Sequence, residues 1–112
     1  MKIGTQSHGS VSVVIPHGPL AGDELGDFRQ RCQAVIDQKS GRVVLDMSDV
    51  PYLDSAGIET LLELCIGQPA ASAQPRLAQL GETCREALDL TDMLGRLNVF
   101  DTVESAIRSY KR

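Results

Sequence analysis

The sequence lacks the features that several common classes of protein require. Its 11 lysines and arginines form no cluster apart from the terminal Lys111-Arg112, and 15 acidic residues give a formal net charge of −4. Because a nucleic-acid interface needs clustered positive charge, DNA and RNA are excluded as ligands. No apolar run approaches the ~20 residues that span a bilayer, and no signal peptide is recognisable. We therefore expect a cytoplasmic protein without direct membrane insertion.

Residues that bind metals or form disulfides are few and scattered. Cys32, Cys65 and Cys84 are widely spaced and contain no Cys-x-x-Cys pair. Each falls inside a predicted helix, which favours reduced, buried thiols. His8 and His17 have no partner at ligand spacing, so the sequence predicts no metal site and no cofactor.

The pattern of apolar residues predicts one α/β domain that comprises residues 1–112. Strands are expected at 2–6, 11–15, 43–45 and 76–80, with a short extended piece at 99–100. Two helices are expected from 22 to 40–41 and from 55 to about 67. A third is expected to begin at a Thr83-x-x-Glu86 capping box, and a fourth at 101 or 102. The small residues at 70–75 form a connection. This order predicts a mixed β-sheet of four to five strands packed by about four helices.

The most informative stretch joins the strand at 43–45 to the second helix through Asp54-Ser55-Ala56-Gly57. A serine at a helix start can be a cap, a nucleophile or a phosphorylation site. A nucleophile needs a base, but His8 and His17 lie in or beside early turns and no G-x-S-x-G elbow is present. The sequence therefore predicts that the protein is not an enzyme.

Capping and phosphorylation stay open together. The helix start that Ser55 caps can also hold a phosphate, because the helix dipole and free amides favour negative charge there. A phosphate-cradling loop is not indicated, since neither G-x-G-x-x-G nor a P-loop is present and Asp54 would repel an anion.

The helix that begins at Ser55 has two distinguishable apolar arcs. One arc is predicted to face the core and consists of Ile58, Leu61, Leu62, Cys65 and Ile66. Ala56, Thr60 and Leu64 fall on a different arc. Leu64 is then either an isolated surface leucine or the anchor of a docking strip that ends at Ser55.

These residues resemble the STAS domain, and more specifically the single-domain anti-sigma factor antagonists (anti-anti-sigma factors) of bacteria. The resemblance rests on Val-Val-Leu-Asp at 43–46, on Ser-Asp-Val-Pro-Tyr-Leu at 48–53 and on Asp-Ser-Ala-Gly-Ile at 54–58. Gly-Pro-Leu at 18–20 and Met-Leu-Gly-Arg-Leu at 93–97 extend it along nearly the whole chain.

The resemblance implies a partner-switching function. Members bind an anti-sigma factor that is also a serine kinase and thereby free the sigma factor for transcription. The kinase phosphorylates the serine after the motif aspartate, here Ser55, and a phosphatase reverses this. The partner-binding positions carried over from the family are Asp54, Ser55, Ala56, Gly57, Thr60 and Leu64.

The sequence departs from the family in the turn before the first helix. Members often carry acidic residues there, whereas this chain has Pro19 and Ala21. The alternative function is therefore a non-phosphorylated STAS accessory module, for example of a membrane transporter, in which Ser55 only caps the helix.

Overall fold

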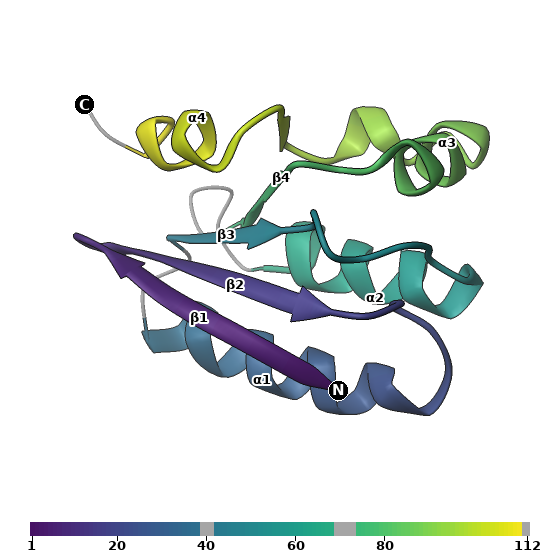
Figure 1. The fold of residues 1–112 in the computed structure, drawn as a ribbon, viewed down its shortest axis with the longest axis horizontal. Helices are drawn as coiled ribbons and strands as arrows, with labels where there is room; N and C mark the ends of the chain where they lie inside the picture. Colours follow the sequence, from purple (N-terminus) through teal and green to yellow (C-terminus); the bar gives the residue numbers. More distant parts are fainter. Residues whose placement is uncertain (39–41, 69–73, 111–112) are drawn as a thin grey trace.

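Five strands form one sheet in the order β1-β2-β3-β4-β5, so strands that follow one another in the chain lie side by side (Figure 1). The computed structural model describes residues 1–38, 42–68 and 74–110. In these residues the strands are β1 (Lys2–His8), β2 (Val11–His17), β3 (Val43–Asp46), β4 (Arg76–Ala78) and β5 (Val99–Phe100). β1 and β2 are antiparallel and the remaining pairs are parallel. The predicted mixed sheet is confirmed.

The described chain contains four α-helices, in the number and order predicted. They are α1 (Leu25–Gln38), which follows the 3-10 turn η1 (Gly22–Glu24), then α2 (Ser55–Ile66), α3 (Glu82–Leu90) and α4 (Val103–Arg108), with a 3-10 turn η3 (Leu94–Arg96) before β5. The predicted helix end at 40–41 and most of the connection at 70–75 lie outside the described residues.

The predicted capping box in α3 is wrong. The N-cap is Gly81, so Thr83 is already the second residue of the helix and cannot cap it. An uncapped start is tolerable because this end of α3 is exposed to water, which can bind the first amides.

Both faces of the sheet are covered, which explains the continuous apolar run in β3. Val43 and Leu45 point into the larger cluster, built mainly with α1, α2 and α3, whereas Val44 points into the smaller cluster beneath α4. All three side chains are fully buried. A strand covered on both faces has no polar side to alternate with its apolar one.

The parallel strands place two loops at one end of the molecule. The chain leaves β2 toward α1 and leaves β3 toward α2, so both connections start at the carboxyl ends of neighbouring strands. The β1–β2 turn lies at the other end of β2 (Figure 1). Among the described helices, none combines the length and the apolar character needed to cross a bilayer.

Candidate functional site

The loops that precede α1 and α2 run side by side. The Gly18 amide donates to the Asp49 carbonyl at 3.0 Å, and the Leu20 amide donates to the Tyr52 carbonyl at 3.2 Å. Leu20 and Leu53 also form a parallel bridge. The first loop therefore braces the segment that enters α2.

Asp54 is the N-cap of α2, and its carboxylate also holds the loop before α1. Its Oδ1 accepts from the Gly57 amide at 2.7 Å, and its Oδ2 accepts from the Gly22 amide at 3.2 Å. Its backbone is extended, at φ −94° and ψ −179°, as an N-cap requires. The expectation that Ser55 caps this helix is therefore wrong, because the aspartate before it supplies the oxygen.

The Ser55 hydroxyl takes no part in holding the fold. Ser55 is the first residue of α2 and is exposed, and its hydroxyl makes no hydrogen bond within the described part of the chain. The amides of Ser55 and Ala56 likewise have no protein acceptor among the described residues. Free amides and the helix dipole make this position favourable for negative charge.

Gly57 is required by a close backbone approach. A β-carbon at this position would lie 2.1 Å from the Leu20 carbonyl oxygen and 3.1 Å from its carbon. That distance is far inside van der Waals contact, so any larger residue would push loop 18–22 away from α2. Gly57 is buried, and its role is to let the two segments meet.

The surface position expected for Leu64 is wrong. Leu64 is 1% exposed, and Thr60 is 8% exposed with its hydroxyl donating to the Ala56 carbonyl at 2.8 Å. The buried arc of α2 is wider than its apolar periodicity suggests, because the helix packs against both the sheet and α1. Its exposed residues are only Ser55, Ala56, Glu59 and Glu63.

An apolar surface beside Ser55 was not predicted. Tyr52 is 48% exposed and Pro51 is exposed as well. Pro19 and Ala21, in the neighbouring loop, are half-buried. The sequence signal that could have revealed this surface is the Pro-Tyr pair between the polar turn and Leu53. So short a connection cannot bury every side chain, so some apolar ones stay exposed.

Among the residues that the structure describes, no ionisable side chain forms a hydrogen bond with the Ser55 hydroxyl. His17 Nδ1 lies 2.6 Å from Asp49 Oδ2, so the ring is engaged by that carboxylate. In the described ranges, no three His, Cys, Asp or Glu side chains gather at metal-binding distance. Burial raises the pKa of Cys32 and of Cys65 to about 12, which leaves both thiols protonated and inert.

Comparison with known proteins places this geometry in context. A family model for the STAS domain matches residues 2–106. A provisionally named anti-sigma factor antagonist of Thermotoga maritima superposes with a TM-score of 0.87, 17% identity and coverage of 98% of this chain and 95% of its own. An anti-sigma factor antagonist of Mycobacterium paratuberculosis superposes with a TM-score of 0.86 and 21% identity, and the match covers 99% of this chain and 94% of its own.

A domain of similar fold also occurs inside a larger protein. The murine anion transporter Solute Carrier 26 family member A9 in its inward-facing state gives a TM-score of 0.77 and 23% identity, and the match covers 95% of this chain but 18% of the transporter. At these identities the likeness to each structure shows a common fold.

Proposed function

Because the chain belongs to the STAS domain family, we propose that it is an anti-sigma factor antagonist that is switched off by phosphorylation of Ser55. The observation that carries this proposal is that capping and exposure belong to different residues at the start of α2. Asp54 caps the helix, and the neighbouring Ser55 hydroxyl is exposed and unused by the fold. A modifying enzyme can therefore reach it without unfolding the helix.

The local electrostatics support tolerance of a phosphate at Ser55. A phosphoserine carries about −1.5 to −2 charges, which the helix dipole and the amides of Ser55 and Ala56 can accommodate. A partner docked on the same surface would meet this charge beside the carboxylate of Asp54. Loss of ~2–3 kcal/mol across the interface corresponds to roughly 30–150-fold weaker binding, which is sufficient for a switch.

The proposed partner is an anti-sigma factor that is also a serine kinase, with a phosphatase that restores Ser55. The chain would act in the bacterial cytoplasm and regulate transcription through binding alone. Within the part of the chain that the structure describes, neither histidine is placed to activate Ser55, because His17 contacts Asp49 and His8 lies at the β1–β2 turn, and this supports a role in binding. The docking surface would comprise Ser55, Ala56 and the exposed apolar rim at Pro51 and Tyr52.

The second candidate is an accessory module that binds another protein, such as a transporter subunit, and is never phosphorylated. The fold shared with part of the murine anion transporter supports it. Pro19 and Ala21 also support it, because they remove acidic groups from the turn beside Ser55. In this case Ser55 would be an ordinary exposed residue.

The first test is phosphorylation by purified anti-sigma factor serine kinases of the source bacterium, with ATP and intact-mass detection. Wild type should gain one phosphate and Ser55→Ala none. Ser48→Ala is the matched control, because Ser48 is an exposed serine in the turn before the same loop. If the wild-type chain stays unmodified with every kinase, or if Ser55→Ala is modified equally, the switch is rejected in favour of the accessory module.

The second test measures binding of each kinase to Ser55→Asp and Ser48→Asp by calorimetry. Ser55→Asp should fold normally, because a carboxylate in the first helical turn gains ~0.3–1 kcal/mol from the dipole. It should nevertheless bind at least tenfold more weakly than Ser48→Asp. Equal affinities would mean that charge at Ser55 does not control the interaction.

A further inference from the structure

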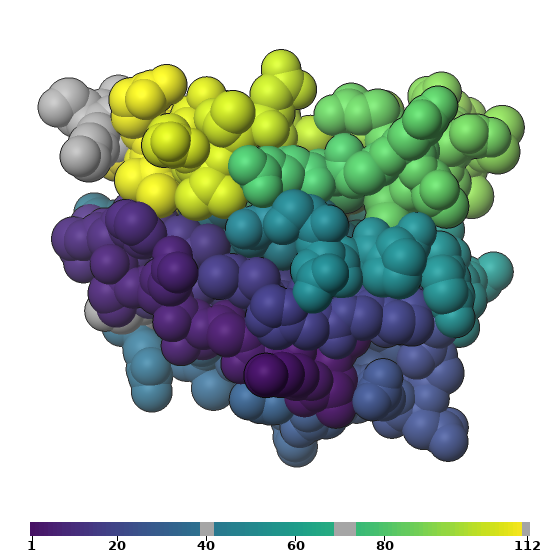
Figure 2. All heavy atoms as spheres, in the orientation of Figure 1, coloured from purple at the N-terminus to yellow at the C-terminus, as the bar shows by residue number. Residues whose placement is uncertain are grey.

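β1 forms one edge of the sheet, and in the described residues its outer side pairs with no other strand. Figure 1 shows it along the margin of the sheet, and its atoms lie on the molecular surface in Figure 2. β1 has seven residues, whereas β5 at the opposite edge has two. β1 therefore presents a long row of backbone amides and carbonyls that another strand could pair with.

No feature of β1 blocks such pairing. Its seven residues pair with β2 without a bulge, from Lys2↔His17 to His8↔Val11. The strand contains no proline, and the residues from 5 to 7 are exposed and uncharged. Proteins usually protect a long edge with a bulge, a proline or a central charge, so an edge without these devices is suited to a partner strand.

The start of β1 is held in place. The Met1 ammonium lies 3.2 Å from a Glu24 carboxylate oxygen, and Arg31 donates to the Met1 carbonyl at 3.2 Å. Ile3 packs against the larger core cluster. These contacts fix the start of the strand to η1 and α1, so its outer edge is formed before any partner arrives.

We propose that β1 pairs antiparallel with β1 of a second copy of this chain, about a two-fold axis at Thr5, to give a continuous sheet across a homodimer. Thr5 is the middle residue of β1, so this register places it opposite its own copy and places Gly4 opposite Gln6. The Thr5 pair is polar and the Gly4–Gln6 pair carries no charge, so both are compatible across strands, whereas like charges are not. Lys2, the strand's only lysine or arginine, falls opposite His8 at the end of the interface.

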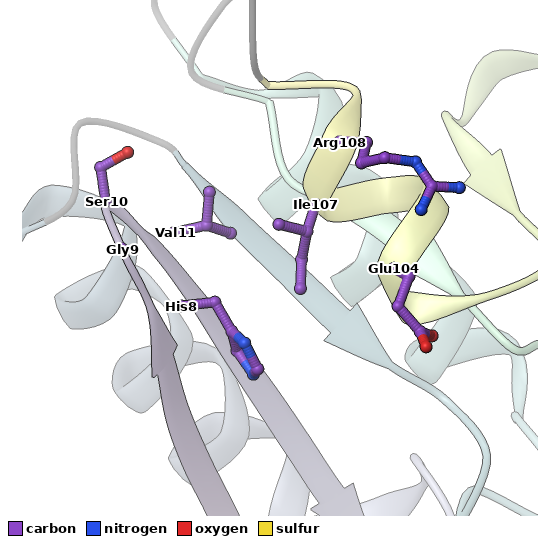
Figure 3. A pocket seen from close by; sticks show the side chains of 7 residues that line it. All are labelled: His8, Gly9, Ser10, Val11, Glu104, Ile107 and Arg108. Carbon is purple, nitrogen blue, oxygen red and sulfur yellow. The ribbon is translucent and has the colours of Figure 1, made fainter.

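The charge around the β1–β2 turn favours a second copy as the occupant. A groove of about 540 Å³ lies between this turn and α4, with Val11 and Ile107 in its floor. Figure 3 shows His8 on the hairpin side and Glu104 on the α4 side, while Arg108 extends away from the hairpin. Glu104 has no ion-pair partner in the described part of the chain.

The two-fold axis brings a cation to this groove. Lys2 and His8 lie on the same face of β1 because six positions separate them, and His8 pairs with Val11, which faces α4. Lys2 of the second copy therefore arrives next to His8, and its flexible side chain can extend into the groove that His8 and Glu104 both line. The symmetry repeats the pair, which an unrelated extended peptide would not supply.

Sedimentation velocity of the full chain over a concentration series tests the dimer. Wild type should show a concentration-dependent monomer–dimer equilibrium. Thr5→Lys, which places two ammonium groups at the axis, should raise the dimer Kd about tenfold or more. Its melting curve at monomeric concentration should match wild type, because Thr5 is exposed. A wild-type chain that stays monomeric at every concentration would overturn the proposal.

Cysteine cross-linking tests the register. Thr5→Cys should form an intermolecular disulfide on oxidation, because opposed residues have Cα atoms about 4.5–5.5 Å apart. Ser7→Cys should not, since its two copies would be about 13 Å apart along the strands. The native thiols do not interfere, as all three are buried. Equal cross-linking of both variants, or of neither, would reject the axis at Thr5.

A charge exchange tests the groove contact. Lys2→Glu and Glu104→Lys should each weaken the dimer several-fold, and the double variant should recover most of the wild-type affinity. If the double variant dimerises no more tightly than the single variants, Lys2 and Glu104 do not form a pair across the interface.

Discussion

Gly57 has no β-carbon, and the backbone of Leu20 occupies the space where one would lie. At the residue scale, the Asp-Ser-Ala-Gly motif thus combines positions with different duties. Asp54 joins two loops and caps α2, and Gly57 permits their contact. Ser55 and Ala56 are exposed and support neither contact. Asp54 and Gly57 therefore hold the start of α2 in place, and Ser55 and Ala56 lie on its surface.

Gly57→Ala should destabilise the protein by about 1–3 kcal/mol, because the added methyl overlaps the Leu20 carbonyl and cannot be accommodated without moving loop 18–22. The matched control is Gly26→Ala in α1, where a β-carbon would meet nothing within 4 Å. That change should instead stabilise by about 0.4–1 kcal/mol. Urea denaturation measures both, and equal effects would refute the close-approach argument.

The three cysteines should be chemically silent in the folded protein. Burial raises the pKa of Cys32 and Cys65 to about 12 and also raises that of Cys84. A higher thiol pKa lowers the thiolate fraction, which at pH 8 is then roughly one in ten thousand for a pKa near 12. Ellman's reagent should react with none of them in native protein and with all three after unfolding. Rapid native reaction would contradict this environment.

At the scale of elements, the sequence predicted the type and order of the helices well and their orientation less well. The start of α2 at Ser55 follows from the preceding aspartate and the switch of apolar period, and both are local signals. The burial of Leu64 is not local. It depends on α1 packing beside α2, where Arg29 and Glu63 form an ion pair at 2.6 Å between the helices. The apolar periodicity of one helix does not indicate which other helix will cover its remaining faces.

Leu64→Ala should cost about 2–5 kcal/mol of unfolding free energy, because it leaves a cavity in the core. Leu90→Ala is the matched control. Leu90, at the end of α3, is 78% exposed, so its loss should change stability by less than about 0.5 kcal/mol. Chemical denaturation of the two variants side by side gives the comparison. Similarly small effects of both variants would mean that Leu64 is not buried in the core.

At the scale of the whole molecule, the sheet divides the interior into two unequal parts. The sequence predicted the layered α/β arrangement, because single helices between strands leave few other solutions. It did not predict that, of the helices in the described residues, the six-residue α4 would be the one that covers the smaller cluster. A helix this short depends on tertiary contacts. Tyr110 supplies one, since its hydroxyl lies 3.0 Å from the Val43 carbonyl and its ring lies under Arg76.

Tyr110→Phe should loosen α4 without unfolding the rest of the sheet. The hydroxyl also lies 3.1 Å from the Gln74 carbonyl, so its removal leaves two backbone acceptors without this donor. We expect a loss of roughly 1 kcal/mol, while the ring contact with Arg76 persists. Hydrogen exchange should accelerate in Val103–Arg108 and change less in Val43–Asp46. Uniform acceleration would mean that α4 and the central strand open together.

The bracing of loop 18–22 by Asp54 also bears on the thermodynamics of recognition. Ordering a loop on association consumes part of the binding free energy, and a surface that is already ordered avoids that loss. Here three backbone hydrogen bonds between the loops, the bridge at Leu20 and both oxygens of Asp54 fix the shape around Ser55 in the free protein. A partner would thus meet a preorganised surface, and a modification there would act through charge, with little entropy of rearrangement to offset it.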